Sequence, residues 1–272
     1  MHVGVKIGPI DGPQLGERAR KAEALGLDSV WLSERVVVPL DEPHPYDPMG
    51  DPWIGLTYVA AVTERVQLGT SVAQIALRYP VQIARILATL DVLSEGRLIV
   101  GGGAGWVKAE FAATGVDFAT RGGRLGEMAR VLRHLWTTPE EPWEGKHFQL
   151  PGVKIYAPKT SGGPPIFLGA GTSAGLRRVA RYADGLLALP GEPEALAAVR
   201  QSLDEKTREA GRDRLPIYAQ AVPPQTAEAG EKLVDDLAGA GVDGIIFADP
   251  LDKGGSFPPD EVVRAIVAKG QG

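Results

Sequence analysis

The chain of 272 residues contains no cysteine, only three methionines and 6% aromatic residues. The absence of cysteine excludes disulfides, a thiolate nucleophile and cysteine-ligated metal sites. No apolar run approaches the roughly 18 residues needed to span a bilayer, and the N-terminus lacks the basic stretch and apolar core of a signal peptide. We therefore expect a cytoplasmic protein with no membrane partner.

The chain also has fewer basic than acidic residues. The 29 lysines and arginines face 34 aspartates and glutamates, which gives a formal net charge of -5 at pH 7, and no stretch of the chain forms a basic cluster. Because nucleic-acid binding needs a basic face that neutralises phosphates, we expect no nucleic-acid partner. The hydrophobic share of 44% is ample for a core, and the charged share of 23% is ordinary for a folded domain.

The chain does contain a repeated alternation of short β-branched runs with longer segments of helical period. Eight such units with near-continuous apolar strands predict an α/β fold, a closed (β/α)8 TIM barrel, with residues 1–272 as one domain. An open doubly wound sheet is the chief alternative. The expected strands are 3–7, 28–32, 66–69, 97–101, 165–169, 185–189, 215–220 and 243–247, and the expected helices between them are 13–25, 52–63, 80–93, 174–182, 192–210, 227–240 and 258–269.

A longer excursion separates the fourth and fifth expected strands. Residues 106–136 predict two helical pieces, with breaks near Gly115 and at Gly122-Gly123. Residues 137–163 are rich in proline, glycine and tryptophan and predict an irregular insertion. The insertion therefore falls between strands 4 and 5 of the barrel.

The fifth strand runs into a glycine-rich stretch, Gly169-Ala170-Gly171-Thr172-Ser173, directly before a helix. In a barrel the active site lies at the C-terminal ends of the strands, so this loop is a prime candidate. Glycines let the backbone approach an anion, and the two hydroxyls with the free N–H groups of a helix start bind phosphate. The alternative to phosphate binding is a purely structural role, as a tight turn whose Ser or Thr caps the helix.

Two enzyme motifs also match this stretch. Residues 171–175 fit the G-x-S-x-G nucleophile elbow, but none of the four histidines follows Ser173, which excludes the chain order of that hydrolase triad. Residues 169–174 fit a dinucleotide fingerprint, yet that motif normally opens the first βαβ unit of an open sheet and this loop is the fifth. We therefore favour the phosphate loop.

Charged and small residues follow two other strands. Glu34 and Arg35 come directly after the second strand, where they would orient a substrate or transfer a proton, or form a salt bridge at the rim. The glycine-rich run 101–105 follows the fourth strand and suggests that something large and flat packs closely against it, the alternative being close helix–strand packing. His44 has no second ligand nearby, so we expect no metal site.

Taken together, several stretches resemble the luciferase-like monooxygenase superfamily, and in particular its branch of oxidoreductases that depend on the deazaflavin coenzyme F420. The matching stretches are residues 22–31, 61–70, 90–98, 105–111, 115–118 with Arg121, and 169–175 followed by 183–185. As a set they are specific for the superfamily and less specific for the cofactor, because the FMN and deazaflavin branches share the scaffold. The resemblance covers residues 1–190 well and the rest in outline.

The resemblance implies coenzyme F420 as cofactor, with FMN as the alternative, a small-molecule substrate and a homodimer. It also implies a non-prolyl cis peptide behind the ring system of the cofactor, a border formed by the loop after strand four, and a phosphate site in the loop after strand five. The residues at these three places are Thr70, Ser71 and Val72; Gly103, Ala104, Gly105 and Trp106; and Gly169, Ala170, Gly171 and Thr172.

The family often carries an acid–histidine pair after the second strand. Glu34 matches the acid, but Arg35 stands where the histidine would be. Because arginine stays charged at neutral pH, we expect Arg35 to bind an anionic substrate or stabilise negative charge rather than shuttle protons.

We therefore expect an oxidoreductase that transfers a hydride between F420 and a small organic substrate, with Glu34 and Arg35 as catalytic residues. An FMN-dependent monooxygenase is the alternative on the same scaffold. A non-catalytic flavin- or deazaflavin-binding barrel is a further alternative, which the missing histidine keeps open.

Overall fold

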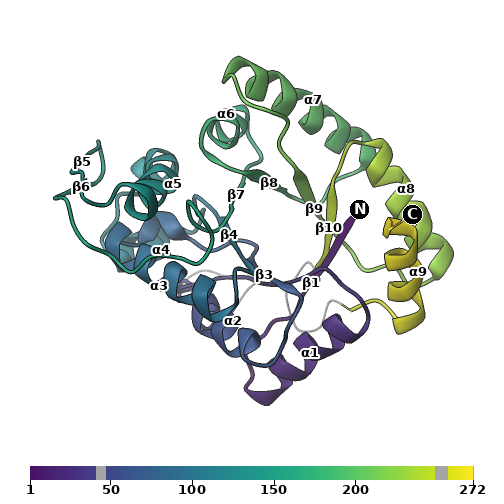
Figure 1. The fold of residues 1–272 in the computed structure, drawn as a ribbon. Helices are drawn as coiled ribbons and strands as arrows, with labels where there is room; N and C mark the ends of the chain where they lie inside the picture. Colours follow the sequence, from purple (N-terminus) through teal and green to yellow (C-terminus); the bar gives the residue numbers. More distant parts are fainter. Residues whose placement is uncertain (41–46, 249–256, 272) are drawn as a thin grey trace.

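Eight parallel strands close into a barrel in the order β1-β10-β9-β8-β7-β4-β3-β2 (Figure 1). The structure is a computed structural model, and it describes residues 1–40, 47–248 and 257–271, so His44 lies outside the described residues. The closed barrel confirms the predicted (β/α)8 fold. Its strands are β1 (His2–Lys6), β2 (Ser29–Leu32), β3 (Gln67–Thr70), β4 (Leu98–Gly102), β7 (Ile166–Gly169), β8 (Gly185–Ala188), β9 (Ile217–Ala221) and β10 (Gly244–Phe247).

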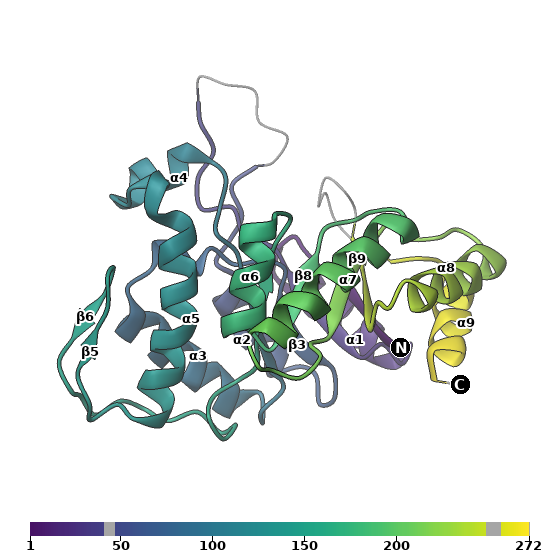
Figure 2. The same cartoon turned by 90° about the horizontal axis from the view of Figure 1, so that it is seen from above.

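Helices surround the barrel on its outer face (Figures 1 and 2). Among the described residues, no helix is long and apolar enough to cross a membrane. The α-helices are α1 (Pro13–Ala24), α2 (Pro52–Ala60), α3 (Pro80–Leu93), α4 (Lys108–Thr114), α5 (Arg121–Thr137), α6 (Ser173–Tyr182), α7 (Pro193–Glu209), α8 (Ala227–Gly239) and α9 (Asp260–Gln271), and the 3-10 helices are η1 (Ile75–Leu77) and η2 (Phe118–Thr120).

The excursion between β4 and β7 contains α4, η2 and α5. The break near Gly115 is confirmed, because α4 ends there on a left-handed residue with φ 70°. The predicted break at Gly122-Gly123 is wrong, since both glycines lie in the first turn of α5. Their role is close packing: a Cβ at 122 would lie 2.6 Å from Nη2 of Arg178, and a Cβ at 123 would lie 2.5 Å from Nε2 of His147.

The insertion is not irregular throughout, because it contains a short antiparallel hairpin, β5 (Trp143–Glu144) and β6 (Gln149–Leu150), beside α5 (Figure 2). The Glu127 carboxylate of α5 holds this hairpin by accepting hydrogen bonds from the backbone N–H groups of His147 and Phe148, at 3.0 and 2.9 Å. Burial raises the pKa of Glu127, but these hydrogen bonds outweigh it and the pKa is lowered. The hairpin is therefore held against α5 by a charged group.

Aromatic side chains fill the interior of the barrel. Phe167 and Tyr218 pack with their ring centroids 5.0 Å apart, and Trp31 meets Tyr218 edge-on at 6.2 Å. Glycines on neighbouring strands make room for them, because a Cβ at Gly69 would lie 2.2 Å from Trp31 and one at Gly185 would lie 2.4 Å from Phe167. The middle of the barrel is thus a packed core, as is usual for this fold.

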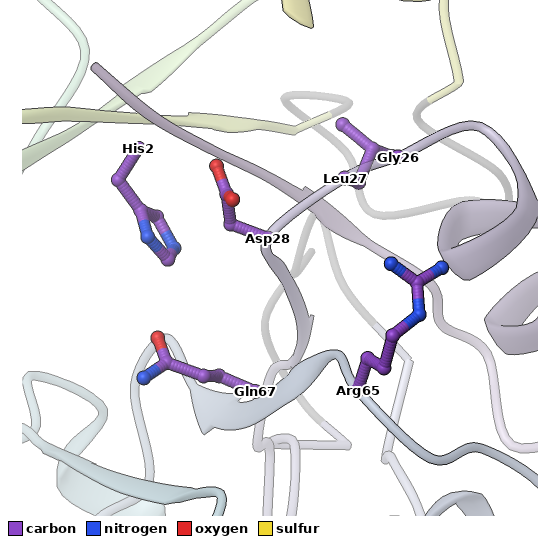
Figure 3. Close-up of a pocket in the computed structure, with 6 residues that line it drawn as sticks. All are labelled: His2, Gly26, Leu27, Asp28, Arg65 and Gln67. Carbon is purple, nitrogen blue, oxygen red and sulfur yellow. The ribbon is translucent and has the colours of Figure 1, made fainter. Parts of the chain in front are cut away.

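A small polar pocket of about 410 Å³ lies at the opposite, N-terminal end of the strands (Figure 3). The His2 ring stacks on Tyr218 with centroids 4.5 Å apart, and its Nε2 lies 2.7 Å from the Ser29 hydroxyl. Trp31 Nε1–H donates to the same hydroxyl at 2.7 Å, so the Ser29 proton is available for Nε2. Burial lowers the pKa of His2 to about 4, with the nearby Asp28 carboxylate opposing the shift.

The lowered pKa of His2 predicts a loss of stability in acid. The pKa falls from 6.5 to about 4 on folding, so the contribution to stability is complete above pH 6.5 and disappears as the pH falls toward 4. At pH 5 the loss relative to pH 7.5 is roughly 2 kcal/mol. Urea unfolding at the two pH values should show a smaller loss in His2→Gln than in the parent chain. Equal losses in the two proteins would contradict the assignment.

Candidate functional site

A cavity of about 680 Å³ opens at the C-terminal ends of the barrel strands, which we call the mouth. Its volume falls within the roughly 300–1,000 Å³ usual for cofactor and small-molecule sites. Glu34, Arg35 and all residues at the three places implied by the resemblance line this cavity, except Thr70. The lining residues that carry the description below are Lys6, Glu34, Arg35, Ser71, Val72, Gln74, Gly103, Ala104, Gly105, Trp106, Gly169, Ala170, Gly171, Thr172, Leu187 and Gln220.

Thr70 is fully buried and lies behind the cavity wall. Its hydroxyl donates to the Gly101 carbonyl at 2.7 Å and accepts from the Gly101 N–H at 3.0 Å, so it joins β3 to β4. The following peptide bond, between Ser71 and Val72, is cis, as the resemblance implies. The Ser71 hydroxyl accepts a hydrogen bond from Gln220 Nε2 at 3.1 Å, which links the β3 loop to the end of β9 across the mouth.

The loops after β4 and β7 both lie against Val72. A Cβ at Gly103 would lie 2.5 Å from Val72 Cγ2, and a Cβ at Gly169 would lie 3.4 Å from Val72 Cγ1. A side chain at either position would therefore crowd the wall or fill the cavity, and glycine keeps the surface flat. A flat surface of this kind fits a planar ring system.

The β7 loop leads directly into the N-terminus of α6. The Thr172 hydroxyl accepts from the Gly175 N–H at 3.1 Å and caps the helix. The amides of Ser173 and Ala174 precede the first intrahelical donor, the Leu176 N–H, which donates to the Thr172 carbonyl at 2.9 Å. Gly171 leaves the approach to them open, because a Cβ there would meet only Leu189 at 3.6 Å. The first-turn amides and the positive end of the helix together suit a phosphate.

Glu34 is held by donors on both carboxylate oxygens. Arg78 Nη1 donates to Oε2 at 2.9 Å, its Nη2 donates to Oε1, and the backbone N–H of Gln74 donates to Oε2 at 2.6 Å. Burial lowers the pKa of Arg78, but the hydrogen bond and charge of Glu34 outweigh burial and raise it. Glu34 therefore acts here as an anionic anchor that fixes the segment after the cis peptide.

Arg35 is neutralised on the other side of the mouth. Its Nη1 donates to Oε2 of Glu110 at 2.8 Å, and Oε1 of Glu110 accepts from the backbone N–H of Val36 at 2.8 Å. The Glu110 side chain is fully buried, and that of Arg35 is 9% exposed. The Trp106 ring covers the guanidinium at 5.0 Å from its centroid and is itself 59% exposed at the rim. Arg35 is thus a fixed cation on the cavity wall.

Several lining or supporting residues were not singled out as site residues from the sequence, among them Lys6, Arg78 and Glu110. Lys6 ends β1 and lines the cavity. Because side chains alternate along a strand and Val3 and Val5 pack in the main hydrophobic core, the alternation could have placed Lys6 on the opposite face of β1. Arg78 gave no local signal, and Glu110 stood only within the matching stretch 105–111, since the role of each is recognised through the charge that it neutralises. Within the described ranges, no group of histidine, aspartate and glutamate is arranged to hold a metal ion.

Comparison with known proteins assigns the chain to a family. The family model described as luciferase-like monooxygenase matches residues 5–254. The chain belongs to the luciferase-like monooxygenase family. This luciferase-like chain is 33% identical to an F420-dependent glucose-6-phosphate dehydrogenase of Amycolatopsis mediterranei, over 85% of its own length and 63% of the length of that relative. It thus spans less than two thirds of that protein.

Other proteins match the luciferase-like chain over similar shares of both lengths. An uncharacterized protein of Mycobacterium tuberculosis is 31% identical over 82% of this chain and 85% of its own length. Among solved structures, an F420-dependent secondary alcohol dehydrogenase matches with a TM-score of 0.79 at 20% identity, covering 97% and 98% of the two chains. A monooxygenase of Streptomyces bottropensis matches with a TM-score of 0.77 at 21% identity, covering 100% and 98%. At these identities the structures support the barrel fold.

The Glu34–Arg78 pair predicts a defined order of destabilisation. Arg78→Met leaves the Glu34 carboxylate buried without its cation, so we expect the free energy of unfolding to fall by about 2–4 kcal/mol. Glu34→Gln should cost less, because Gln still accepts from the Gln74 N–H and Arg78 keeps Asp51 at 3.1 Å. Urea unfolding of the two variants measures both values.

The matched control for this pair is Lys232→Met, which breaks an exposed ion pair with Asp236 on α8. Such surface pairs contribute little, so its unfolding curve should overlay that of the parent chain. A loss in Arg78→Met no larger than in this control would contradict the anchoring role of the pair.

Proposed function

We propose that the chain is an oxidoreductase that uses coenzyme F420, a deazaflavin, to transfer a hydride to or from a small organic substrate. The observation that carries the proposal is a flat-walled cavity with a phosphate-binding helix start, in a chain whose relatives of 30–36% identity are named F420-dependent. Because the chain spans only 55–63% of the length of those dehydrogenases, glucose 6-phosphate is not proposed as its substrate.

The residues of the β7 loop would hold the cofactor by its phosphate. The amides of Ser173 and Ala174 would donate hydrogen bonds to the phosphate oxygens, and Thr172 keeps the first turn of α6 in place through Gly175. Ser71 and Val72 would form the wall behind the ring, with Gly103 and Gly169 beside it. When bound, the deazaflavin supplies the hydride chemistry.

The substrate would lie between the ring and the charged side of the mouth. Arg35, fixed by Glu110 and covered by Trp106, presents a permanent positive charge to a carbonyl oxygen, alkoxide or anionic group of the substrate. Glu34 positions the β3 loop through the Gln74 amide. Because Arg78 donates to both of its carboxylate oxygens, we propose a positioning role for Glu34 rather than proton transfer to the substrate. The packed side chains of the barrel interior exclude water from the floor of the cavity.

Cofactor binding tests the proposal directly. We expect the purified chain to bind F420 more tightly than FMN, measured by equilibrium dialysis with each. Gly171→Asp should weaken F420 binding by about tenfold or more, because it brings a carboxylate toward the phosphate without crowding the backbone. Gly239→Asp is the matched control, since a side chain there meets nothing within 4 Å and Gly239 lies on α8, outside the cavity lining.

The same proteins separate the alternatives. Arg35→Ala should keep F420 binding and lose turnover across a panel of alcohols, ketones, imines and sugars, while Arg35→Lys retains part of it. Tight FMN binding with no F420 binding would favour the FMN-dependent monooxygenase. F420 binding without turnover by the parent chain on any substrate would favour a non-catalytic binding barrel.

A homodimer, which the resemblance implies, stays a prediction. Large apolar side chains are exposed on the adjacent helices α2 and α3, among them Ile54 at 74% and Leu93 at 56%. We propose this face as the contact with a second copy, because burying such side chains is favourable. Light scattering should give twice the chain mass, and Ile54→Glu with Leu93→Glu should give a monomer. A parent chain of single mass would overturn the prediction.

A further inference from the structure

Three arginines lie on two neighbouring helices: Arg121 in the first turn of α5, and Arg177 and Arg178 in the middle of α6. We call them the arginine cluster. Figure 2 shows α5 and α6 side by side, and the two helices are in contact. Arg177 Nη1 donates to the Ser173 hydroxyl at 3.0 Å, so its guanidinium lies at the start of α6, next to the cavity-lining Thr172.

Arg178 reaches from α6 across to the first turn of α5. Its stem packs 3.3 Å from the position of a Cβ at Gly126, and its Nη2 lies 2.6 Å from that of a Cβ at Gly122. Gly122 follows Arg121, whose guanidinium covers the Phe118 ring at 4.0 Å. The cluster therefore extends from the phosphate-binding loop to the start of α5.

No acidic side chain balances this charge within the described residues. None of the ion pairs formed there includes a member of the arginine cluster, whereas Arg35 and Arg78 at the cavity are both paired. Neither α5 nor α6 has an acid in its first turn, where the helix dipole would favour one. Burial lowers the pKa of Arg178, which is half-buried. The positive charges of the three arginines and the positive ends of the two helix dipoles are therefore not balanced by an acid of the described residues.

We propose that the arginine cluster binds the acidic tail of the cofactor, beyond its phosphate. This inference rests on the proposed function. The phosphate of F420 carries a lactate followed by γ-linked glutamates, and each glutamate adds one carboxylate, whereas the side chain of FMN ends at its phosphate. A tail that leaves the β7 loop meets Arg177 first and then Arg178 and Arg121, whose planar guanidinium groups pair well with carboxylates. The cluster would then select F420 over FMN by its tail.

Binding of two F420 forms to the full chain tests this, one without glutamates and one with several, by quenching of deazaflavin fluorescence. At about 0.05 M salt the glutamate-bearing form should bind about tenfold more tightly, and the difference should shrink at about 0.5 M salt. Arg177→Ala with Arg178→Ala should remove the difference and leave the affinity for the glutamate-free form unchanged. If the double variant fails to fold, Arg177→Ala alone replaces it, because Arg177 is exposed. This single variant should reduce the difference in affinity between the two forms by half or more.

Arg181→Ala is the matched control, because Arg181 is an exposed arginine in the last turn of the same helix. It should behave as the parent chain with both cofactor forms. Equal affinity of the parent chain for the two forms would overturn the role of the cluster and leave the proposed function standing. Failure of both forms to bind, with FMN bound, would overturn the proposed function itself.

Discussion

Two adjacent residues of opposite charge, Glu34 and Arg35, are buried at the end of β2, and the loops around the mouth are arranged to neutralise them. A buried charge without a partner costs several kcal/mol, so each needs its own counterion. The two side chains do not satisfy each other: Glu34 pairs with Arg78, after the β3 loop, and Arg35 pairs with Glu110, on α4. Two segments around the cavity are thereby joined to one strand end.

The barrel interior supplies the second constraint on the site. Val72 and Leu187 belong at once to the interior apolar cluster and to the cavity lining. The floor of the cavity therefore rests on the packed aromatic rings of Trp31, Phe167 and Tyr218. Because those rings fill the barrel interior, a ligand in this cavity stays at the C-terminal ends of the strands, where the loop glycines leave the walls flat.

Much of this was predictable from the sequence, because it depends on local patterns. The alternation of strands and helices predicts the barrel, and the rule that strand ends carry the site selects the loops that line the cavity. The partners of the two charged residues were not predictable, since they lie 44 and 75 positions away in the chain. Gly122 was misread for the same reason: a glycine that admits a distant arginine has the same local signature as a helix break.

The distribution of charge around the mouth separates positioning from binding. At the cavity wall, cations and acids pair within the chain, so their charges fix loops and Arg35 keeps one orientation. On α5 and α6, three arginines form no ion pair with an acid of the described residues, and folding brings Arg121 close to Arg178, which is 57 positions away in the chain. A charge balanced internally is useful for geometry, whereas a charge left unbalanced beside a phosphate loop is useful for an anion from outside.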